Sequence, residues 1–204
     1  VVFLHGFLGC QDDWLEVVEP LKSAYDLILI DLPGHGASAE LPGQAYQLDS
    51  CSIAISETLA AIGLHSYTLV GYSMGGRIAL YHAVHQPRIV KSLVLVSANP
   101  GIVSASERIS RLAHDAELAQ KLEQEPLERF VEDWYDQPLF ESLRHSPLYE
   151  QTRTRRLGGN PAALARALTG FSVGRQMPLW DDLPRLTMPV MGIAGQLDIR
   201  YTDI

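Results

Sequence analysis

The stretch Tyr67-Thr68-Leu69-Val70-Gly71-Tyr72-Ser73-Met74-Gly75-Gly76-Arg77 decides how the rest of the chain is interpreted. It begins as a short apolar run and continues, after its glycines, into a segment with helical character. A G-x-S-x-G pattern between a strand and a helix puts the serine on a sharp turn, where glycines remove Cβ atoms that would clash. We therefore expect Ser73 to stand clear of the sheet, beside the backbone N–H groups of a helix N-terminus. Glycine-rich turns after strands are also common, so this elbow (residues 71–75) needs support from other segments.

The length and composition of the chain are those of a globular protein. Its 204 residues fit one domain, or one core with an insertion. The net charge of −8 argues against nucleic acid or an anionic membrane as a partner. It is compatible with a small anionic substrate, because a few arginines can reverse the field in a cleft. With only two cysteines, Cys10 and Cys51, and no apolar run that could span a bilayer, we expect a cytoplasmic protein.

Apolar segments alternate with helical ones through the first half of the chain. Besides the strand before the elbow, we predict strands over residues 1–4, 25–30, 90–96 and 188–195, and helices over 48–62, 107–122, 127–135 and 161–168. Continuous apolar strands separated by helices indicate an α/β fold, a mostly parallel sheet with helices on both faces. Residues 104–183 contain helical segments and no convincing strand, which predicts a helical lid over the carboxyl ends of the strands. The predicted core is then discontinuous, over residues 1–103 and 184–204.

Two further motifs follow predicted strands. His5-Gly6-Phe7-Leu8-Gly9 comes directly after the first strand, so a backbone N–H near Phe7 can join that of Met74 as a pair of oxyanion donors. Asp198 follows the last strand and comes after Ser73 in chain order, as a Ser…Asp…His triad requires. Its carboxylate would hold the tautomer of a histidine and stabilise the imidazolium. Such an aspartate alone is more often a turn or cap residue, but the combination favours catalysis.

The histidine of this triad is absent from the sequence. All seven histidines precede Asp198, in loops, helices and turns where none is a good general base: His5, His35, His65, His82, His85, His114 and His145. Chain order puts the base after the acid, so we expect it roughly 20–30 residues beyond Asp198. The chain also opens inside an apparent strand. We therefore expect it to be truncated at both ends and catalytically incomplete as written.

Together with Asp31-Leu32-Pro33-Gly34-His35-Gly36, these motifs resemble the α/β-hydrolase superfamily. A narrower resemblance, to the family of 2-succinyl-6-hydroxy-2,4-cyclohexadiene-1-carboxylate synthases of menaquinone biosynthesis, extends through the lid. It rests on Arg77, on Asn99-Pro100-Gly101 with Arg108 and Arg111, on residues 133–140, and on Arg156 before Asn160. The sequence departs from that family in the absent histidine, the absent first strands, and Gln196 where an acidic residue is common. The resemblance implies a triad that removes a proton and expels pyruvate without a cofactor, and we expect no metal site.

The resemblance also implies substrate-binding residues. Arg77 lies one helical turn beyond Ser73, and a buried guanidinium there needs either a structural partner or an anionic ligand, which we weigh equally. On the residues alone, Arg111 would form solvent-facing salt bridges, and the resemblance instead implies that it binds substrate, as does Arg156. Arginine suits carboxylates because its planar fork bonds both oxygens. Tyr72 and Trp134 complete the implied set, although an aromatic residue on a lid helix more often packs onto the core.

The resemblance therefore implies a carbon–oxygen lyase. It would eliminate pyruvate from 2-succinyl-5-enolpyruvyl-6-hydroxy-3-cyclohexene-1-carboxylate, a small anionic polycarboxylate, to give 2-succinyl-6-hydroxy-2,4-cyclohexadiene-1-carboxylate. Ser73 would act as a base within a relay, although the same triad suits a nucleophile. One alternative is a serine hydrolase of carboxylic esters, thioesters or C–C bonds; another is a non-catalytic, hydrolase-like binding module. We expect a monomer or a weak homo-oligomer.

Overall fold

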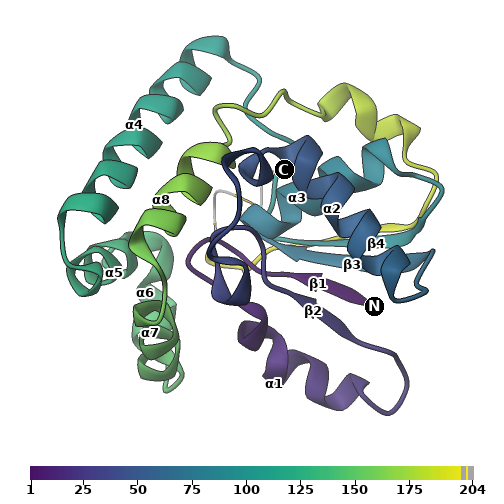
Figure 1. Cartoon of the computed structure of the whole chain (residues 1–204), viewed down its shortest axis with the longest axis horizontal. Coiled ribbons are helices and arrows are strands. Elements are labelled where there is room, and N and C mark those ends of the chain that lie inside the picture. The colour runs from purple at the N-terminus through teal and green to yellow at the C-terminus, as the bar shows by residue number, and fades with distance from the viewer. Residues whose placement is uncertain (199–200, 202–204) are drawn as a thin grey trace.

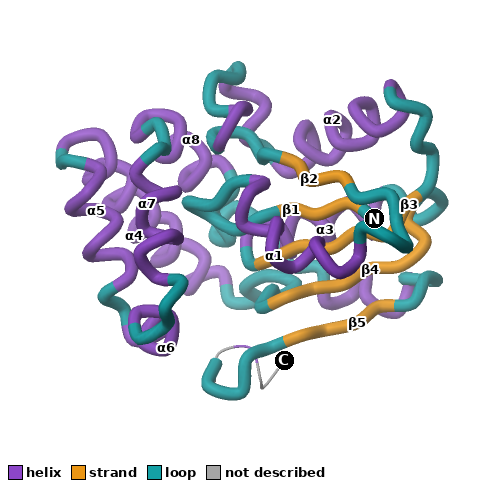
Figure 2. The backbone as a smooth tube through the Cα atoms, turned by 90° about the horizontal axis from the view of Figure 1, so that it is seen from below, coloured by secondary structure: helices purple, strands orange, loops and turns teal. Residues whose placement is uncertain are grey.

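A parallel sheet of five strands forms the centre of the computed structural model, which describes residues 1–198 and 201. The strands are β1 (Val2–Leu4), β2 (Ile28–Ile30), β3 (Tyr67–Tyr72), β4 (Val90–Val96) and β5 (Val190–Ile193). Their order in the sheet is β2-β1-β3-β4-β5, and Figure 2 shows them side by side. The strand order reverses between β1 and β3, and open α/β sheets bind ligands at the carboxyl ends beside such a point.

Helices cover both faces of the sheet because successive strand residues point to opposite sides. In Figure 1, α2 (Leu48–Ala61) and α3 (Met74–His85) lie above the strands, and α1 (Leu15–Val18) lies below them. Val2 and Leu69 belong to the main apolar cluster, to which both α2 and α3 contribute. Phe3 and Val70 face the other way and pack with Trp14, whose ring centroid is 5.1 Å from that of Phe3.

Five helices form the segment between β4 and β5. They are α4 (Ala105–Gln124), α5 (Leu127–Tyr135), α6 (Glu141–Arg144), α7 (Tyr149–Leu157) and α8 (Pro161–Gly170). Residues 104–183, all of which the structure describes, contain no strand. Figures 1 and 2 place these helices beyond the carboxyl ends of the strands. The division into a core and a lid at residues 104 and 183 stays a prediction.

The lid helices have an apolar cluster of their own that also includes a residue of the core. Leu122 and Phe130 pack with Leu164 and Leu168 of α8. Leu8, from the loop after β1, is buried in the same cluster. Packing therefore fixes the lid against the loop that follows β1.

The predicted fold class is confirmed, and the differences lie in the extents of the elements. The strand expected over 25–30 is reduced to β2, because pairing with β1 runs only from Ile28 to Ile30. The expected buried strand over 188–195 is β5, whose four residues are exposed. In the described part of the chain β5 pairs with β4 alone, so it lies at an edge of the sheet. Helices α1, α6 and α7 were not predicted, and α4 is longer than expected at both ends.

Candidate active site

The elbow forms the sharp turn that the sequence predicts between β3 and α3. Ser73 has φ 52° and ψ −112°, a strained conformation for a residue with a side chain. Its N–H donates to the Val96 carbonyl at 2.9 Å, which secures the turn to β4. A Cβ atom at Gly71 would lie 2.4 Å from the Gly75 carbonyl oxygen, and one at Gly75 would lie 2.4 Å from the carbonyl oxygens of Leu4 and His5. Close backbone packing therefore requires these glycines and holds Ser73 in its strained geometry.

The sheet register brings the loop after β1 beside the elbow. Leu4 pairs with Gly71, so the residues that follow each of them are neighbours. A Cβ atom on Gly6 would lie 2.8 Å from the Tyr72 ring and 3.4 Å from the Ser73 Cβ. Phe7 and Met74 both line the cavity that contains Ser73. Their backbone N–H groups remain our proposed oxyanion donors.

His5 fixes the loop after β1 instead of serving as a base. Its Nδ1 lies 2.8 Å from the Gly6 carbonyl, and its Nε2 accepts the Leu32 N–H at 3.0 Å, which together define the neutral Nδ1–H tautomer. Burial lowers the pKa of His5. Burial, together with the neighbouring His5, also lowers the pKa of His35 to about 3. Both imidazoles are therefore neutral at physiological pH.

Another buried histidine lies away from the elbow. His82 on α3 is hydrogen-bonded to Ser52 Oγ at 2.9 Å and to the Tyr67 hydroxyl at 2.7 Å. Burial lowers its pKa to about 4. This group joins α2, β3 and α3, and none of its three residues lines a cavity that contains Ser73.

Ser73 lies where two cavities meet. The larger chamber, of about 480 Å³, brings together eight of the nine residues singled out from the sequence: Phe7, Tyr72, Ser73, Met74, Arg77, Arg111, Trp134 and Asp198. The ninth, Arg156, lines the smaller chamber of about 310 Å³. Phe7, Tyr72, Ser73 and Trp134 line both chambers. A ligand at Ser73 can therefore extend in two directions.

Two arginines of the larger chamber are held in different ways. Arg77 Nη1 donates to Gln176 Oε1 at 2.9 Å, and its Nη2 donates to the Phe171 carbonyl at 2.6 Å. Arg111 Nε donates to Asp115 Oδ1 at 2.7 Å, and the Asp115 side chain is only 1% exposed. The solvent-facing salt bridge that the residues alone favour for Arg111 is therefore wrong. Asp115 is buried and Arg111 is partly exposed, and both line the chamber, so the ion pair forms part of the chamber wall.

Arg156 is the most enclosed of the arginines proposed to bind substrate, with 8% of its surface exposed. Its Nε donates to the Tyr135 hydroxyl at 2.9 Å and its Nη1 to Asp13 Oδ1 at 2.8 Å. Burial alone would lower the pKa of this guanidinium, but Tyr135 and Asp13 outweigh burial and raise it. Neither partner was predicted from the sequence. Arg156 and Asp13 are 143 positions apart in the sequence, and no local pattern indicates that they meet.

Asp198 lies in the tight turn after β5, where its N–H donates to the Gly195 carbonyl at 2.9 Å. It lines the larger chamber, and among the described residues its buried Oδ1 has no hydrogen-bond partner. A buried carboxylate oxygen is costly unless a donor reaches it. The position therefore suits an acid that accepts the N–H of a catalytic histidine.

The described residues show neither a clustered metal site nor a membrane-spanning helix. They contain no group of three or more histidine, cysteine, aspartate or glutamate side chains placed to hold a metal ion. None of their helices combines the length and the apolar character needed to cross a membrane.

Comparison with known proteins connects this geometry to a family. The sequence profile of the alpha/beta hydrolase fold matches residues 1–170. The chain belongs to the α/β-hydrolase family. Within that family it resembles the 2-succinyl-6-hydroxy-2,4-cyclohexadiene-1-carboxylate synthase of Photorhabdus laumondii, with 38% identity over all of this chain and 72% of that protein. The synthase of Serratia proteamaculans is 37% identical over all of this chain and 79% of its own length.

Solved structures of the α/β-hydrolase family agree. The structure of MenH from S. aureus superposes with a TM-score of 0.94 and 34% identity, over all of this chain and 77% of that one. An esterase from Thermogutta terrifontis, solved with malate bound, gives a TM-score of 0.82 and 25% identity, over 96% of this chain and 70% of that one. Both the fold class and the family resemblance stated from the sequence are confirmed.

Proposed function

We propose that this α/β-hydrolase is a lyase of menaquinone biosynthesis that eliminates pyruvate to form 2-succinyl-6-hydroxy-2,4-cyclohexadiene-1-carboxylate. The names of its relatives support the reaction. The observation that carries it in the site is the distribution of guanidinium groups. Arg77 and Arg111 line the larger chamber and Arg156 the smaller, with Ser73 at the junction. The substrate bears three carboxylates, on its ring, its succinyl group and its enolpyruvyl group, and an enclosed carboxylate needs a cation.

The elimination is a proton transfer coupled to the loss of a leaving group. Ser73, activated by a histidine that Asp198 orients, would take a ring proton beside the succinyl ketone. The ketone oxygen gains negative charge, which the N–H groups of Phe7 and Met74 would stabilise. A new ring double bond forms as the C–O bond to the enolpyruvyl group breaks. The enolpyruvate leaves and, after taking up a proton on carbon, becomes pyruvate.

The remaining roles position the substrate. Arg77, Arg111 and Arg156 would bind carboxylates, and Tyr72 and Trp134 would line the path between the chambers. We also propose that the protein acts in the cytoplasm without a cofactor, as a monomer or a weak homo-oligomer. Its two cysteines are unpaired, which agrees with a reducing compartment.

Pyruvate release tests the proposal. The protein expressed from its natural reading frame should release pyruvate from the pathway substrate, measured by coupling to lactate dehydrogenase and NADH. Ser73→Ala should reduce the rate at least 1,000-fold, because the triad acts as a unit. Ser92→Ala, on the same sheet but outside both chambers, is the matched control. Brisk cleavage of simple aryl esters without any release of pyruvate would refute the lyase and support a serine hydrolase.

A further inference from the structure

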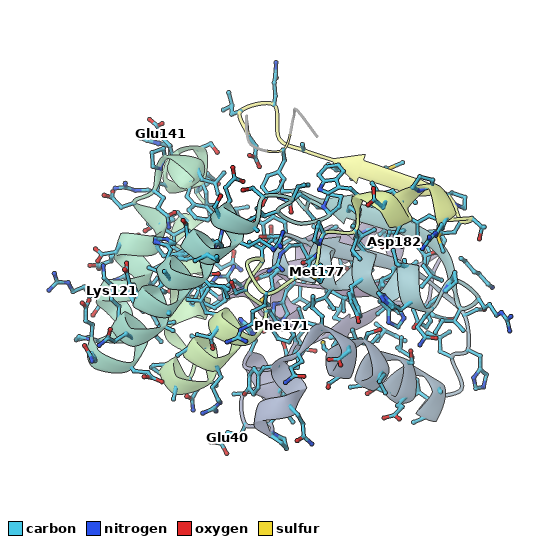
Figure 3. All side chains as sticks on the ribbon, turned by 90° about the horizontal axis from the view of Figure 1, so that it is seen from above. Glu40, Lys121, Glu141, Phe171, Met177 and Asp182 are labelled. Carbon is cyan, nitrogen blue, oxygen red and sulfur yellow. The ribbon has the colours of Figure 1, made fainter. Side chains whose placement is uncertain are left out.

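Hydrogen bonds join the two segments that connect the lid to the sheet. Residues 97–104 leave β4 for the lid, and residues 171–180 return from it; we call them together the lid neck. Leu179 N–H donates to the Pro100 carbonyl at 2.8 Å, and Trp180 Nε1 donates to the Gly101 carbonyl at 2.9 Å. Figure 3 places Phe171 and Met177, both on the return segment, between the lid helices and the helices that cover the sheet.

Gln176 connects this neck to the active site. Its side-chain amide is buried, at 2% exposure, and both ends of the amide are used. Nε2 donates to the Pro100 carbonyl at 3.1 Å, and Oε1 accepts from Arg77 Nη1 at 2.9 Å. The Phe171 carbonyl, also on the return segment, accepts from Arg77 Nη2 at 2.6 Å. Two nitrogens of the Arg77 guanidinium on α3 therefore donate hydrogen bonds to the lid neck.

We propose that Gln176 is a positioning residue that orients Arg77 toward the substrate. The inference rests on the proposed function, since it assigns a task to a residue of the same site. An arginine side chain is flexible and loses rotamer entropy when it binds an anion. A guanidinium that hydrogen bonds already hold in one orientation loses less entropy, so it binds the anion more tightly. An amide oxygen provides this orientation without adding a negative charge beside the anion-binding group. A carboxylate at the same place would compete with the substrate.

The same contacts make the position of Arg77 depend on the neck. Pro100 lies on the outgoing segment, while Gln176 and Phe171 lie on the return segment. A movement that separates the two segments breaks the hydrogen bond from Gln176 to the Pro100 carbonyl, and so removes the contact that fixes the Gln176 amide beside Arg77. The orientation of Arg77 therefore depends on the return segment of the lid neck, and on Gln176 in particular.

Steady-state kinetics on the protein from its natural reading frame test this role. Gln176→Met keeps the bulk and removes both hydrogen bonds, so we expect KM for the pathway substrate to rise at least tenfold with a smaller change in kcat. Gln176→Glu keeps an acceptor for Arg77 but adds a charge, and should also raise KM at least tenfold. Trp180→Phe removes a different neck hydrogen bond and should change KM by less than twofold.

A double-mutant cycle shows whether Gln176 acts through Arg77. If it does, Arg77→Met combined with Gln176→Met should be no worse than Arg77→Met alone, because the second change has nothing left to orient. Independent effects whose KM increases multiply would overturn the proposal. So would a folded Gln176→Met or Gln176→Glu protein with KM within twofold of the wild type, or an equal effect from Trp180→Phe.

Side-chain NMR separates this inference from the proposed function. Hydrogen bonds at both Nη atoms slow rotation about the Nε–Cζ bond of Arg77, which is visible in ¹⁵N spectra without any substrate. Gln176→Met should speed this rotation, whereas Trp180→Phe should not; unchanged rotation in the Gln176→Met protein refutes the positioning role. Failure of the wild-type protein to release pyruvate would instead refute the lyase, and the NMR result would be unaffected.

Discussion

Replacing Arg156 by methionine separates its structural contribution from its proposed contact with substrate. Methionine keeps most of the apolar bulk and removes the hydrogen bonds to Tyr135 and Asp13. Removing one partner of a buried ion pair costs about 3–5 kcal/mol, because the other charge stays behind. The Asp13 side chain is 21% exposed and lies 3.5 Å from the Arg155 guanidinium, so water and Arg155 offset part of this cost. We therefore expect the lower end of the range, about 3 kcal/mol.

Urea denaturation followed by circular dichroism measures the loss. The midpoint should fall while the slope m stays constant, because the surface exposed on unfolding is nearly the same. At about 2–4 °C per kcal/mol for a chain of this size, the thermal midpoint should fall by roughly 6–12 °C. Arg153→Met is the matched control on the same helix. Arg153 pairs with Glu128 and Glu132, each more than half exposed, so its removal should cost less than about 1 kcal/mol.

A second substitution checks the mechanism of the loss. Adding Asp13→Asn to Arg156→Met removes the stranded charge and should restore more than about 1 kcal/mol. A loss below about 1 kcal/mol in Arg156→Met alone, or equal losses in Arg156→Met and Arg153→Met, would refute the reasoning. Arg156 would then contribute little to the fold, and its proposed role would be substrate binding alone.

Two further predictions concern the scaffold. Gly75→Ala should destabilise the protein by about 4 kcal/mol or more, because the new Cβ meets two backbone carbonyls that cannot move aside. Gly43→Ala is the control: a Cβ there would have no atom within 4 Å, so the urea midpoint should change little. The folded-state pKa of His82 is about 4, below the ordinary 6.5, so the unfolded chain binds a proton first as the pH falls. The contribution of His82 to the free energy of unfolding should thus be fully present above about pH 6.5 and fall by up to about 3 kcal/mol toward pH 4. The urea midpoint of His82→Gln should depend less on pH over this range than that of the wild-type protein.

The elements that sequence analysis predicted well are those whose signals are local. The elbow combines an apolar run, small residues at fixed spacing and a helix, and the steric demands of the turn leave few other residues possible. Helix α5 begins and ends at Leu127 and Tyr135, as expected. The strand at 188–195 was predicted to be buried because its residues are apolar. Apolar content predicts a strand, but its place in the sheet depends on which strands pair with it.

The contacts that define the site could not be predicted, because they join distant positions. Arg77 and Gln176 are 99 positions apart, and Gln176 has no sequence pattern that marks it. The partner of Arg111 is the exception. Asp115 lies four positions along α4, the spacing at which helix residues meet, so the pair could have been found from the sequence. Its burial could not, because that depends on how α4 packs against α8.

Two kinds of constraint therefore meet at Ser73, and they differ in what a substitution would change. The serine is placed by backbone packing, in which Gly6, Gly71 and Gly75 allow the strands and α3 to approach one another. The side chains of the arginines around it are placed by contacts with the lid, with the lid neck and, for Arg156, with Asp13. A substitution in the backbone set distorts the elbow itself, whereas one in the side-chain set leaves Ser73 in place and alters which anions are bound. Within a family that shares the elbow, substrate choice should therefore reside in the lid and the neck.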